Sequence, residues 1–522
     1  MRRAVAIALI ATLAGFGIVT FGMLAAPVVT DADFAVGELY VQLAARATLD
    51  VGPYSRFGWH HPGPLYFYLN APFYALSGHQ AATMYAVAVA INIAAIALIG
   101  WVIVRESRSP LAAAVVGSCL LFAWRLPNYL ASPWTGHVAV LPSVAVLVMA
   151  ASVAAGRLGW LPLLVVFGSF VTQTHVGFVP VVFVVMVVAA AAGIPRARRH
   201  GTPLAPMLGV SALVLLVLWS VPIIEALANR GGNVAALWRF FVTEGSTGHS
   251  MREAIVTGSY GLTAILRPDF DLPWAGHFPM THEWLSVAAA LIAIALLIVV
   301  ARRAFGDDRR FDGWLATMSL AAMAAGILSL TRVRGDILNH DLFRIAAIGT
   351  LTLGVIAGAA FGAASAAVRA AALPATLRRA AVGLAVVAVA ALGVRDLLSM
   401  TAFERRHQQR SPIVPAYDAI RKYIAGQGVR KPLVSIDADR WGEAAGVLLR
   451  LVRDGTPVAV TDAHVPTFST ALAPRGDEDA LITFANLELH RELRAKPETT
   501  VLLQSFPLFV DAARIGSAPL GR

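Results

Sequence analysis

Long apolar runs recur through most of this chain, and they constrain its fold more than any other feature of the sequence. Each run is long enough, or nearly so, to cross the ~30 Å hydrocarbon core of a bilayer as a helix. Charged residues make up only 14% of the chain, against about 25% in soluble domains, so lipid must solvate most of it. The runs lie near residues 4–27, 81–104, 110–126, 138–155, 159–173, 176–194, 205–224, 284–301, 313–331, 342–366 and 380–396. The sequence therefore predicts a mainly α, polytopic transmembrane helical bundle of about eleven spans.

Arginines are distributed unevenly between successive loops, and this asymmetry predicts the orientation. The arginine-rich side holds Arg2, Arg3, Arg105, Arg108, Arg157, Arg196, Arg198, Arg199, Arg302, Arg303, Arg309, Arg310, Arg369, Arg378 and Arg379. The positive-inside rule places this side, with the N-terminus, in the cytoplasm, and an odd number of spans leaves the C-terminus outside. Because the chain is also rich in Arg and Ala, which suggests a bacterial genome, we expect a multi-pass protein of a bacterial plasma membrane.

Several classes of protein are disfavoured by what the sequence contains. The formal net charge of +11 does not indicate a nucleic-acid partner, because the basic residues punctuate apolar runs instead of forming one patch. A single cysteine, Cys119, excludes an intrachain disulfide. The sequence has no Gly-X-Ser-X-Gly elbow and no Walker-type glycine loop, which argues against a serine hydrolase and against ATP as an energy source.

Three polar segments interrupt or follow the apolar runs, and all three fall on the predicted outer side. They are residues 28–80, 225–283 and 399–522. Loops longer than ~15 residues are usually functional or form domains of their own. We therefore expect residues 1–398 to form a transmembrane domain that includes the first two segments as outer loops. The third segment should be a separate extracytoplasmic domain.

The C-terminal segment has the pattern of a small α/β domain. Short apolar runs at 432–437, 457–461 and 499–504 are typical of strands, and 441–452 has the spacing of an amphipathic helix. Its polar strand ends could bind a ligand, but the segment shows no phosphate-binding glycine loop and no complete catalytic set. An accessory role and a binding role both stay open.

Two acidic residues follow the first predicted span. Asp31 and Asp33 stand two positions apart at the expected membrane surface. Such a pair can share a divalent metal ion, or divide into a general base and a residue that orients it. The alternative is an ordinary pair of interfacial acids at the end of a helix.

The same first outer segment contains an unusual run from Tyr54 to Asn70. It includes Arg56 and the adjacent pair His60 and His61. Its aromatic residues are Trp59, Tyr66, Phe67 and Tyr68. Aromatic side chains of this kind lie at headgroup depth, so we expect a helix along the membrane surface whose entry is fixed by prolines at 62 and 64. A purely structural helix would not require two adjacent histidines.

Further polar candidates lie in two other predicted outer loops. The loop 331–344 breaches the positive-inside pattern, so an anion should compensate its cations. These cations are Arg332, Arg334, His340 and Arg344. Their partner could be a specific phosphate or the headgroups of bulk lipid. His175 follows a short span and is either part of a site or a hydrogen-bonded structural residue.

An aspartate just after the first span, a long first outer loop with a juxtamembrane helix, many spans and an outer C-terminal domain resemble the GT-C glycosyltransferases. These enzymes use polyprenyl-phosphate sugars as donors. The resemblance covers the whole topology, although its motifs are short, and the actinobacterial arabinosyl- and mannosyltransferases of envelope synthesis are the relatives it suggests. It implies that Asp31 or Asp33 is the catalytic base on an acceptor hydroxyl. The substrate-binding candidates are then Arg56, His60, His61, His175, Arg332, Arg334, His340 and Arg344.

The resemblance implies a specific activity, which has two rivals. The enzyme would move arabinofuranose, mannose or a similar sugar from the lipid donor to an extracytoplasmic envelope glycan or glycolipid. A transporter or a lipid or polysaccharide flippase should instead carry ionisable residues within its spans, or broken helices in repeated halves. The predicted spans contain almost no such residues. A non-catalytic envelope scaffold is the third reading.

Overall fold

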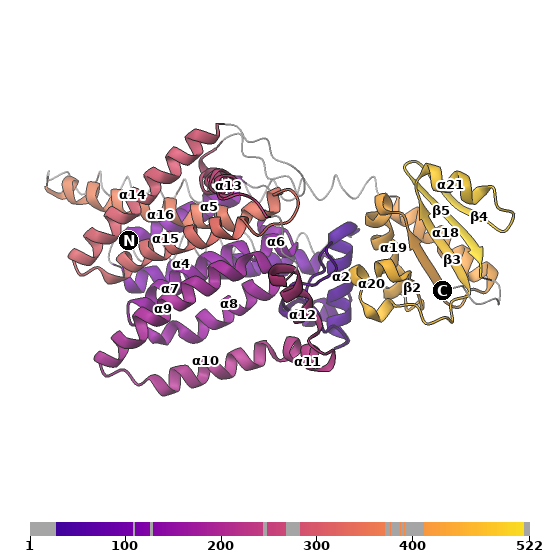
Figure 1. Cartoon of the computed structure of the whole chain (residues 1–522), viewed down its shortest axis with the longest axis horizontal. Coiled ribbons are helices and arrows are strands. Elements are labelled where there is room, and N and C mark those ends of the chain that lie inside the picture. Colours follow the sequence, from indigo (N-terminus) through magenta and orange to yellow (C-terminus); the bar gives the residue numbers. More distant parts are fainter. Residues whose placement is uncertain are drawn as a thin grey trace. The chain divides into compact units, whose positions relative to one another are not determined.

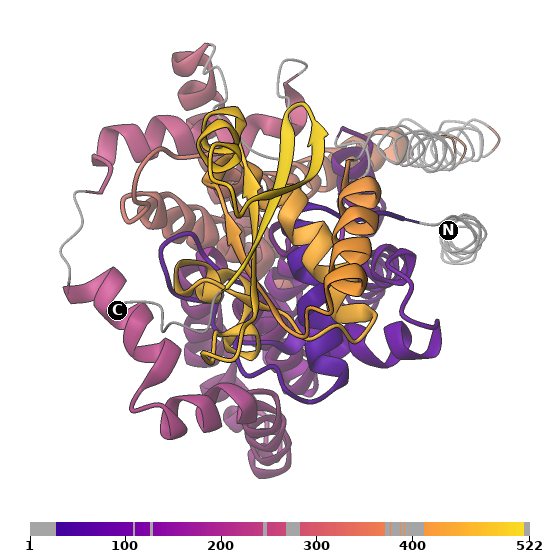
Figure 2. The ribbon, with the colours of Figure 1, turned by 90° about the vertical axis from the view of Figure 1, so that its right-hand side faces the viewer.

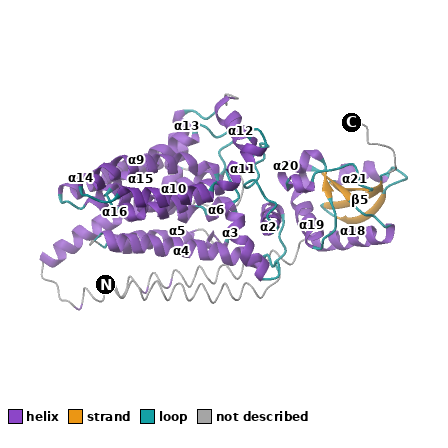
Figure 3. Cartoon of the chain, turned by 90° about the horizontal axis from the view of Figure 1, so that it is seen from below, coloured by secondary structure: helices purple, strands orange, loops and turns teal. Residues whose placement is uncertain are grey.

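The computed structural model describes residues 28–107, 110–125, 129–243, 248–267, 282–370 and 412–515, with single residues at 376, 387 and 391. Figure 3 shows that the described chain is mostly helical and that its strands are confined to the C-terminal part. The chain divides into two compact units (Figure 1). One, here called the helical unit, contains the described residues between 86 and 401. The other, here called the mixed unit, contains 28–85 and 412–515.

The helical unit confirms that the predicted apolar runs form helices. Among the described residues, six helical segments are long and apolar enough to cross a membrane: Ala82–Glu106, Thr135–Ala154, Val176–Arg199, Glu283–Gly306, Arg310–Leu330 and Asn339–Ala364. These segments correspond to α4 (Ala82–Glu106), α6 (Thr135–Val138) with α7 (Val140–Ala154), η3 (Val176–Phe178) with α9 (Val179–Arg199), α14 (Glu283–Gly306), α15 (Arg310–Leu330) and α16 (Asn339–Ala370).

The remaining predicted runs have three different outcomes. The run 205–224 forms two helices, α10 (Leu204–Leu218) and α11 (Ser220–Ala228), with a bend of 52° between them. The runs 110–126 and 159–173 form the shorter α5 (Leu111–Arg125) and α8 (Leu161–Thr174). The run 4–27, and the run 380–396 apart from residues 387 and 391, lie outside the described residues, so the total number of spans and the orientation stay predictions.

Close contact between helices in this unit depends on glycine. Helix α7 is buried along its whole length, and Gly193 of α9 lies so near it that a Cβ would fall 2.1 Å from the Val153 carbonyl oxygen. Helix α16 packs on α5. A Cβ at Gly354 would clash with Val115, and a Cβ at Gly358 would clash with Leu111. Membrane helices associate through such small residues because lipid provides no hydrophobic force between them.

The second predicted outer loop is partly helical. Its described residues form α12 (Gly232–Trp238), the π-helical η4 (Arg239–Thr243), α13 (Met251–Thr263) and η5 (Ala264–Leu266). Helix α13 packs against α14, α15 and α16, so this part of the loop belongs to the helical unit.

The C-terminal part of the mixed unit is the predicted α/β domain. It contains α18 (Ile413–Gln427), β1 (Pro432–Ile436), α19 (Trp441–Arg453), β2 (Ala459–Val460), α20 (Val465–Phe468), β3 (Ala480–Ala485), α21 (Leu487–Arg494), β4 (Thr500–Ser505) and β5 (Leu508–Arg514). The sheet order is β2-β1-β3-β5-β4, with β1 parallel to β2 and β3, and β5 antiparallel to β3 and β4. Figure 2 shows the yellow and orange strands beside the orange helices α18 and α19. The predicted strands and helix are confirmed, while β3 and β5 were not predicted.

The first predicted outer loop packs on this α/β domain. It forms α2 (Ala32–Ala45) and α3 (Leu65–Leu76), and α2 packs along both α3 and α19. Glycines again permit the approach, because a Cβ on Gly446 of α19 would lie 2.7 Å from the Thr30 carbonyl oxygen. Residues 28–85 therefore form one compact unit with the C-terminal domain.

A buried ion pair reinforces the contact between α2 and α19. Glu38 is fully buried, and Arg453 donates a hydrogen bond to its carboxylate. The hydroxyls of Thr30 and Tyr74 donate to the same carboxylate at 2.7 and 2.8 Å. Burial raises the pKa of Glu38. Among the groups that act in the opposite direction, the Arg453 charge has the largest effect. The network satisfies a carboxylate that would otherwise be costly to bury.

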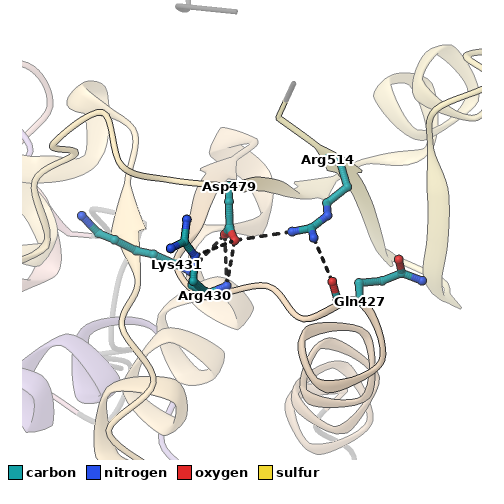
Figure 4. A network of polar contacts seen from close by, with 5 residues as sticks. All are labelled: Gln427, Arg430, Lys431, Asp479 and Arg514. Atoms are coloured by element: carbon teal, nitrogen blue, oxygen red, sulfur yellow. Dashed lines mark hydrogen bonds and ion pairs between the residues drawn. The ribbon is translucent and has the colours of Figure 1, made fainter. Parts of the chain in front are cut away.

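Another polar network fixes the start of the parallel strands β1 and β3. Figure 4 shows the Asp479 carboxylate contacted by Arg430, Lys431 and Arg514. It accepts hydrogen bonds from the backbone amides of Arg430 at 2.9 Å and Lys431 at 3.0 Å, and the Arg514 guanidinium also donates to Gln427 at 2.8 Å. Although burial acts in the other direction, these amides and the Arg514 charge lower the pKa of Asp479. Asp479 thereby links the starts of β1 and β3 to the end of β5.

Arg453→Met should destabilise the protein by about 3 kcal/mol, because it leaves the Glu38 carboxylate buried without its cation. The double variant Glu38→Leu with Arg453→Met should recover part of this loss, since no buried charge remains. The apparent melting temperature of the purified protein in detergent measures both effects. Equal melting temperatures for the single and double variants would show that the ion pair does not matter.

Asp479→Asn should weaken the C-terminal domain near neutral pH and have little effect in acid. The folded-state pKa of Asp479 is lowered, so its stabilising contribution is present above the unfolded pKa of about 4 and is lost as the pH falls through the folded value. Hydrogen–deuterium exchange of the β1 amides, compared between variant and wild type at each pH, measures this. A difference that persists undiminished at about pH 2 would argue against the charge.

Candidate functional site

The acidic pair lies at the start of α2. Asp31 is the exposed residue that precedes the helix, and Asp33 is a partly buried residue of its first turn. The phenol hydroxyl of Tyr54 donates a hydrogen bond to Asp33 Oδ1. Ala32, between the two aspartates, has a φ of 43°, in the left-handed region that costs a non-glycine residue about 1–3 kcal/mol. Surrounding contacts therefore hold this segment in a conformation that the local sequence does not favour.

Tyr54 itself stands in a tight turn. Its backbone forms a bridge with His60, and the Ser55 amide donates to the Trp59 carbonyl at 2.9 Å. Position 52, next to this turn, requires glycine, because a Cβ there would lie 2.3 Å from the His61 carbonyl oxygen. The turn brings Tyr54 into contact with Asp33, which lies 21 positions earlier in the sequence.

The two predicted histidines flank the same turn. His60 is partly buried, and burial lowers its pKa against the opposing hydrogen bond with the Pro466 backbone. His61 is buried, with its ring edge to face with Trp59 at 5.4 Å. Both residues thus contribute to packing within the mixed unit, and His60 is held in its neutral form at neutral pH.

Arg56 occupies the exposed tip of the turn, where its guanidinium lies 4.9 Å from the centre of the Phe57 ring. The helix predicted after the prolines is confirmed as α3, which begins at Leu65 directly after Pro64.

A second cluster of candidates lies in the helical unit, around the start of α16. Arg344 is buried in the second turn of that helix, with Nη1 3.7 Å from Asp341 Oδ1 and Nη2 donating to Ser329 Oγ at 3.4 Å. A Cβ on Gly177 would lie 2.8 Å from Arg344 Nη1 and 3.0 Å from His175 Nδ1. The structure therefore brings His175 and Arg344 together at Gly177.

The first residues of α16 add further polar groups to this cluster. His340 lies with its ring centre 5.7 Å from that of Trp134, and its Nε2 is 3.9 Å from Asp341 Oδ2. Asn339, the first residue of α16, is fully buried, and neither side-chain atom has a hydrogen-bond partner within the described part of the chain. A buried amide without partners is costly, so this position suits a ligand that can both donate and accept.

The other two cations of this loop are placed differently. Arg334 donates to the Phe240 carbonyl at 2.6 Å, and its guanidinium lies 3.9 Å above the Phe240 ring. It therefore connects the loop to η4. Arg332 is exposed.

No group of three or more His, Cys, Asp or Glu side chains is arranged to hold a metal ion in the ranges that the structure describes. A metal shared by Asp31 and Asp33 stays a prediction. The residues that sequence reasoning missed are those whose role depends on contacts between distant segments: Glu38, Tyr54, Gly177, Asn339, Trp441 and Arg453.

The chain has the fold of the GT-C membrane glycosyltransferases, which confirms the predicted resemblance at the level of fold. Two solved structures of ArnT from Cupriavidus metallidurans share it. The one bound to undecaprenyl phosphate is 14% identical, with a TM-score of 0.61 over 96% of this chain and 97% of that chain. The apo structure is 13% identical, with a TM-score of 0.58 over the same shares. No family model and no curated protein matches the chain.

Proposed function

We propose that this chain is a membrane glycosyltransferase that takes its sugar from a polyprenyl-phosphate donor. The observation that carries the proposal is the fold shared with ArnT along almost the whole chain, in a structure that holds undecaprenyl phosphate. A sugar such as arabinofuranose or mannose would be transferred to an extracytoplasmic envelope glycan or glycolipid. These finer assignments rest on the resemblance to the envelope enzymes.

The chemistry requires a base and a site for the leaving phosphate. The acceptor hydroxyl oxygen attacks the anomeric carbon, the bond from that carbon to the phosphate oxygen breaks, and polyprenyl phosphate leaves. The hydroxyl proton must go to a carboxylate within hydrogen-bond reach, and Asp31 or Asp33 is proposed for this role. Negative charge grows on the phosphate as it leaves, so cationic and neutral donors stabilise the transition state.

The cluster at the start of α16 has the groups that a phosphate needs. Arg344 supplies a guanidinium, His175 and His340 supply ring nitrogens, and Asn339 supplies a buried amide without a protein partner in the described residues. Asp341 keeps Arg344 paired in the absence of an anion. We propose that the donor phosphate replaces Asp341 as the partner of Arg344, through charge-assisted hydrogen bonds.

Asp31→Asn and Asp33→Asn test the base directly. The variant that removes the base should lose about 10²- to 10⁴-fold in transfer rate, because a neutral amide cannot accept the proton. Transfer of labelled sugar from a synthetic polyprenyl-phosphate donor measures it, in protein shown to insert normally. Asp50→Asn, at an exposed acid of the same segment, is the matched control. Full activity in both test variants would mean that the assigned base is wrong.

Gly177→Ala tests the phosphate site without removing a charge. The new methyl would displace Arg344 and His175, so the KM for the donor should rise by about tenfold. Gly159→Ala is the control, because nothing lies within 4 Å of a Cβ there. If Gly177→Ala leaves the donor KM at the wild-type value, the phosphate is bound elsewhere.

A further inference from the structure

We propose that Tyr54 is a positioning residue for Asp33, and that the C-terminal domain holds both Tyr54 and the start of α2 in place. The inference rests on the proposed glycosyl transfer and assigns to this domain a part in the reaction. It depends on contacts within the mixed unit alone.

Tyr54 and Asp33 are in direct contact. The phenol donates to Asp33 Oδ1, and the bridge between Tyr54 and His60 fixes the backbone that carries it. A second backbone bond, from the His61 amide to the Pro53 carbonyl at 2.7 Å, closes the same turn. The hydrogen bond thus comes from a donor with little freedom to move, which is what a positioned carboxylate requires.

The C-terminal domain supports this contact through α19. The ring of Trp441, the first residue of α19, lies edge to face with the Tyr54 ring at 6.2 Å. One residue further, a Cβ on Gly442 would lie 3.4 Å from the Ala32 Cβ, so α19 approaches the strained residue between the two aspartates to within the width of one methyl group. Gly446 lies against the Thr30 carbonyl in the same way. Helix α19 therefore supports both partners of the hydrogen bond.

Burial and the charges around Tyr54 and Asp33 keep the phenol protonated. Burial, followed by the Asp33 charge, raises the pKa of Tyr54, so the phenol stays protonated and remains a donor. Tyr40 acts on Tyr54 in the same direction. In the described part of the chain, the segments around this pair also carry Asp31 on α2, His60 across the bridge, and Arg440 with Glu443, which pair at 3.6 Å at the start of α19. A hydrogen bond donated to a carboxylate stabilises its charged form, so Tyr54 favours ionised Asp33.

Tyr54→Phe tests the proposal by removing a single hydroxyl. Without that donor the pKa of Asp33 should rise, and the acid limb of the kcat/KM profile for sugar transfer should move up by about one pH unit. Tyr68→Phe is the matched control, because that phenol donates to the Leu49 carbonyl at 2.8 Å in the same unit. Its profile should match the wild type. A structural loss alone would lower the rate at every pH and leave the limb in place.

Trp441→Phe tests the part played by the C-terminal domain and covers the case in which Tyr54→Phe fails to fold. The smaller ring supports Tyr54 less well, so the limb should move in the same direction by a smaller amount. If Asp33→Asn is inactive while Tyr54→Phe keeps the wild-type limb, the role of Tyr54 is overturned and the proposed base stands. If Asp33→Asn is fully active, Asp33 is not the base and the role of Tyr54 is overturned with it. An unchanged limb in Trp441→Phe overturns the domain's role.

Discussion

The buried ion pair between Glu38 and Arg453 joins residues that are 415 positions apart in the sequence. One of them lies on α2, the helix that begins with the acidic pair, and the other ends α19 of the C-terminal domain. A carboxylate can be buried this deeply only if its charge and its lone pairs are satisfied, and here two hydroxyls complete the shell. The geometry of the mixed unit follows from this requirement, because it fixes α2 against α19.

Sequence reasoning predicts the helical unit well because the lipid environment makes the signal strong. Backbone groups in hydrocarbon must bond within the helix, so every span is a long apolar run. The same reasoning found β1, β2, β4 and α19 in the C-terminal domain but not β3 or β5. Strand β3 is buried on both faces and shows no alternation of polar and apolar residues. Its identity is set by pairing with β1 and β5, which lie far away in sequence.

In the candidate site, too, some residues stand out in the local sequence pattern, while others gain their role only through contacts with distant segments. Asp31 and Asp33 are candidates because their position after an apolar run is a local signal, and His175 and Arg344 because they are polar groups near apolar runs, and the roles of all four stay predictions. Nothing in the sequence around Tyr54 distinguishes it from the other aromatic residues of the first loop. Its significance comes from the turn that brings it to Asp33. Asn339 was equally inconspicuous, since only the structure shows that its amide is buried without a partner in the described residues.

The packing of α2 on α19 also has a consequence for how the protein is made. Chains leave the ribosome N-terminus first, so α2 is synthesised long before α19. Until α19 has emerged from the ribosome, Glu38 has no guanidinium beside it. Ala32, whose backbone is in the left-handed region, has no helix α19 near it. The first loop can therefore reach its final conformation only after α19 has been synthesised. A ribosome that stops before α19 would release a chain that contains α4 to α16 but in which Glu38 and Ala32 lack their contacts with α19.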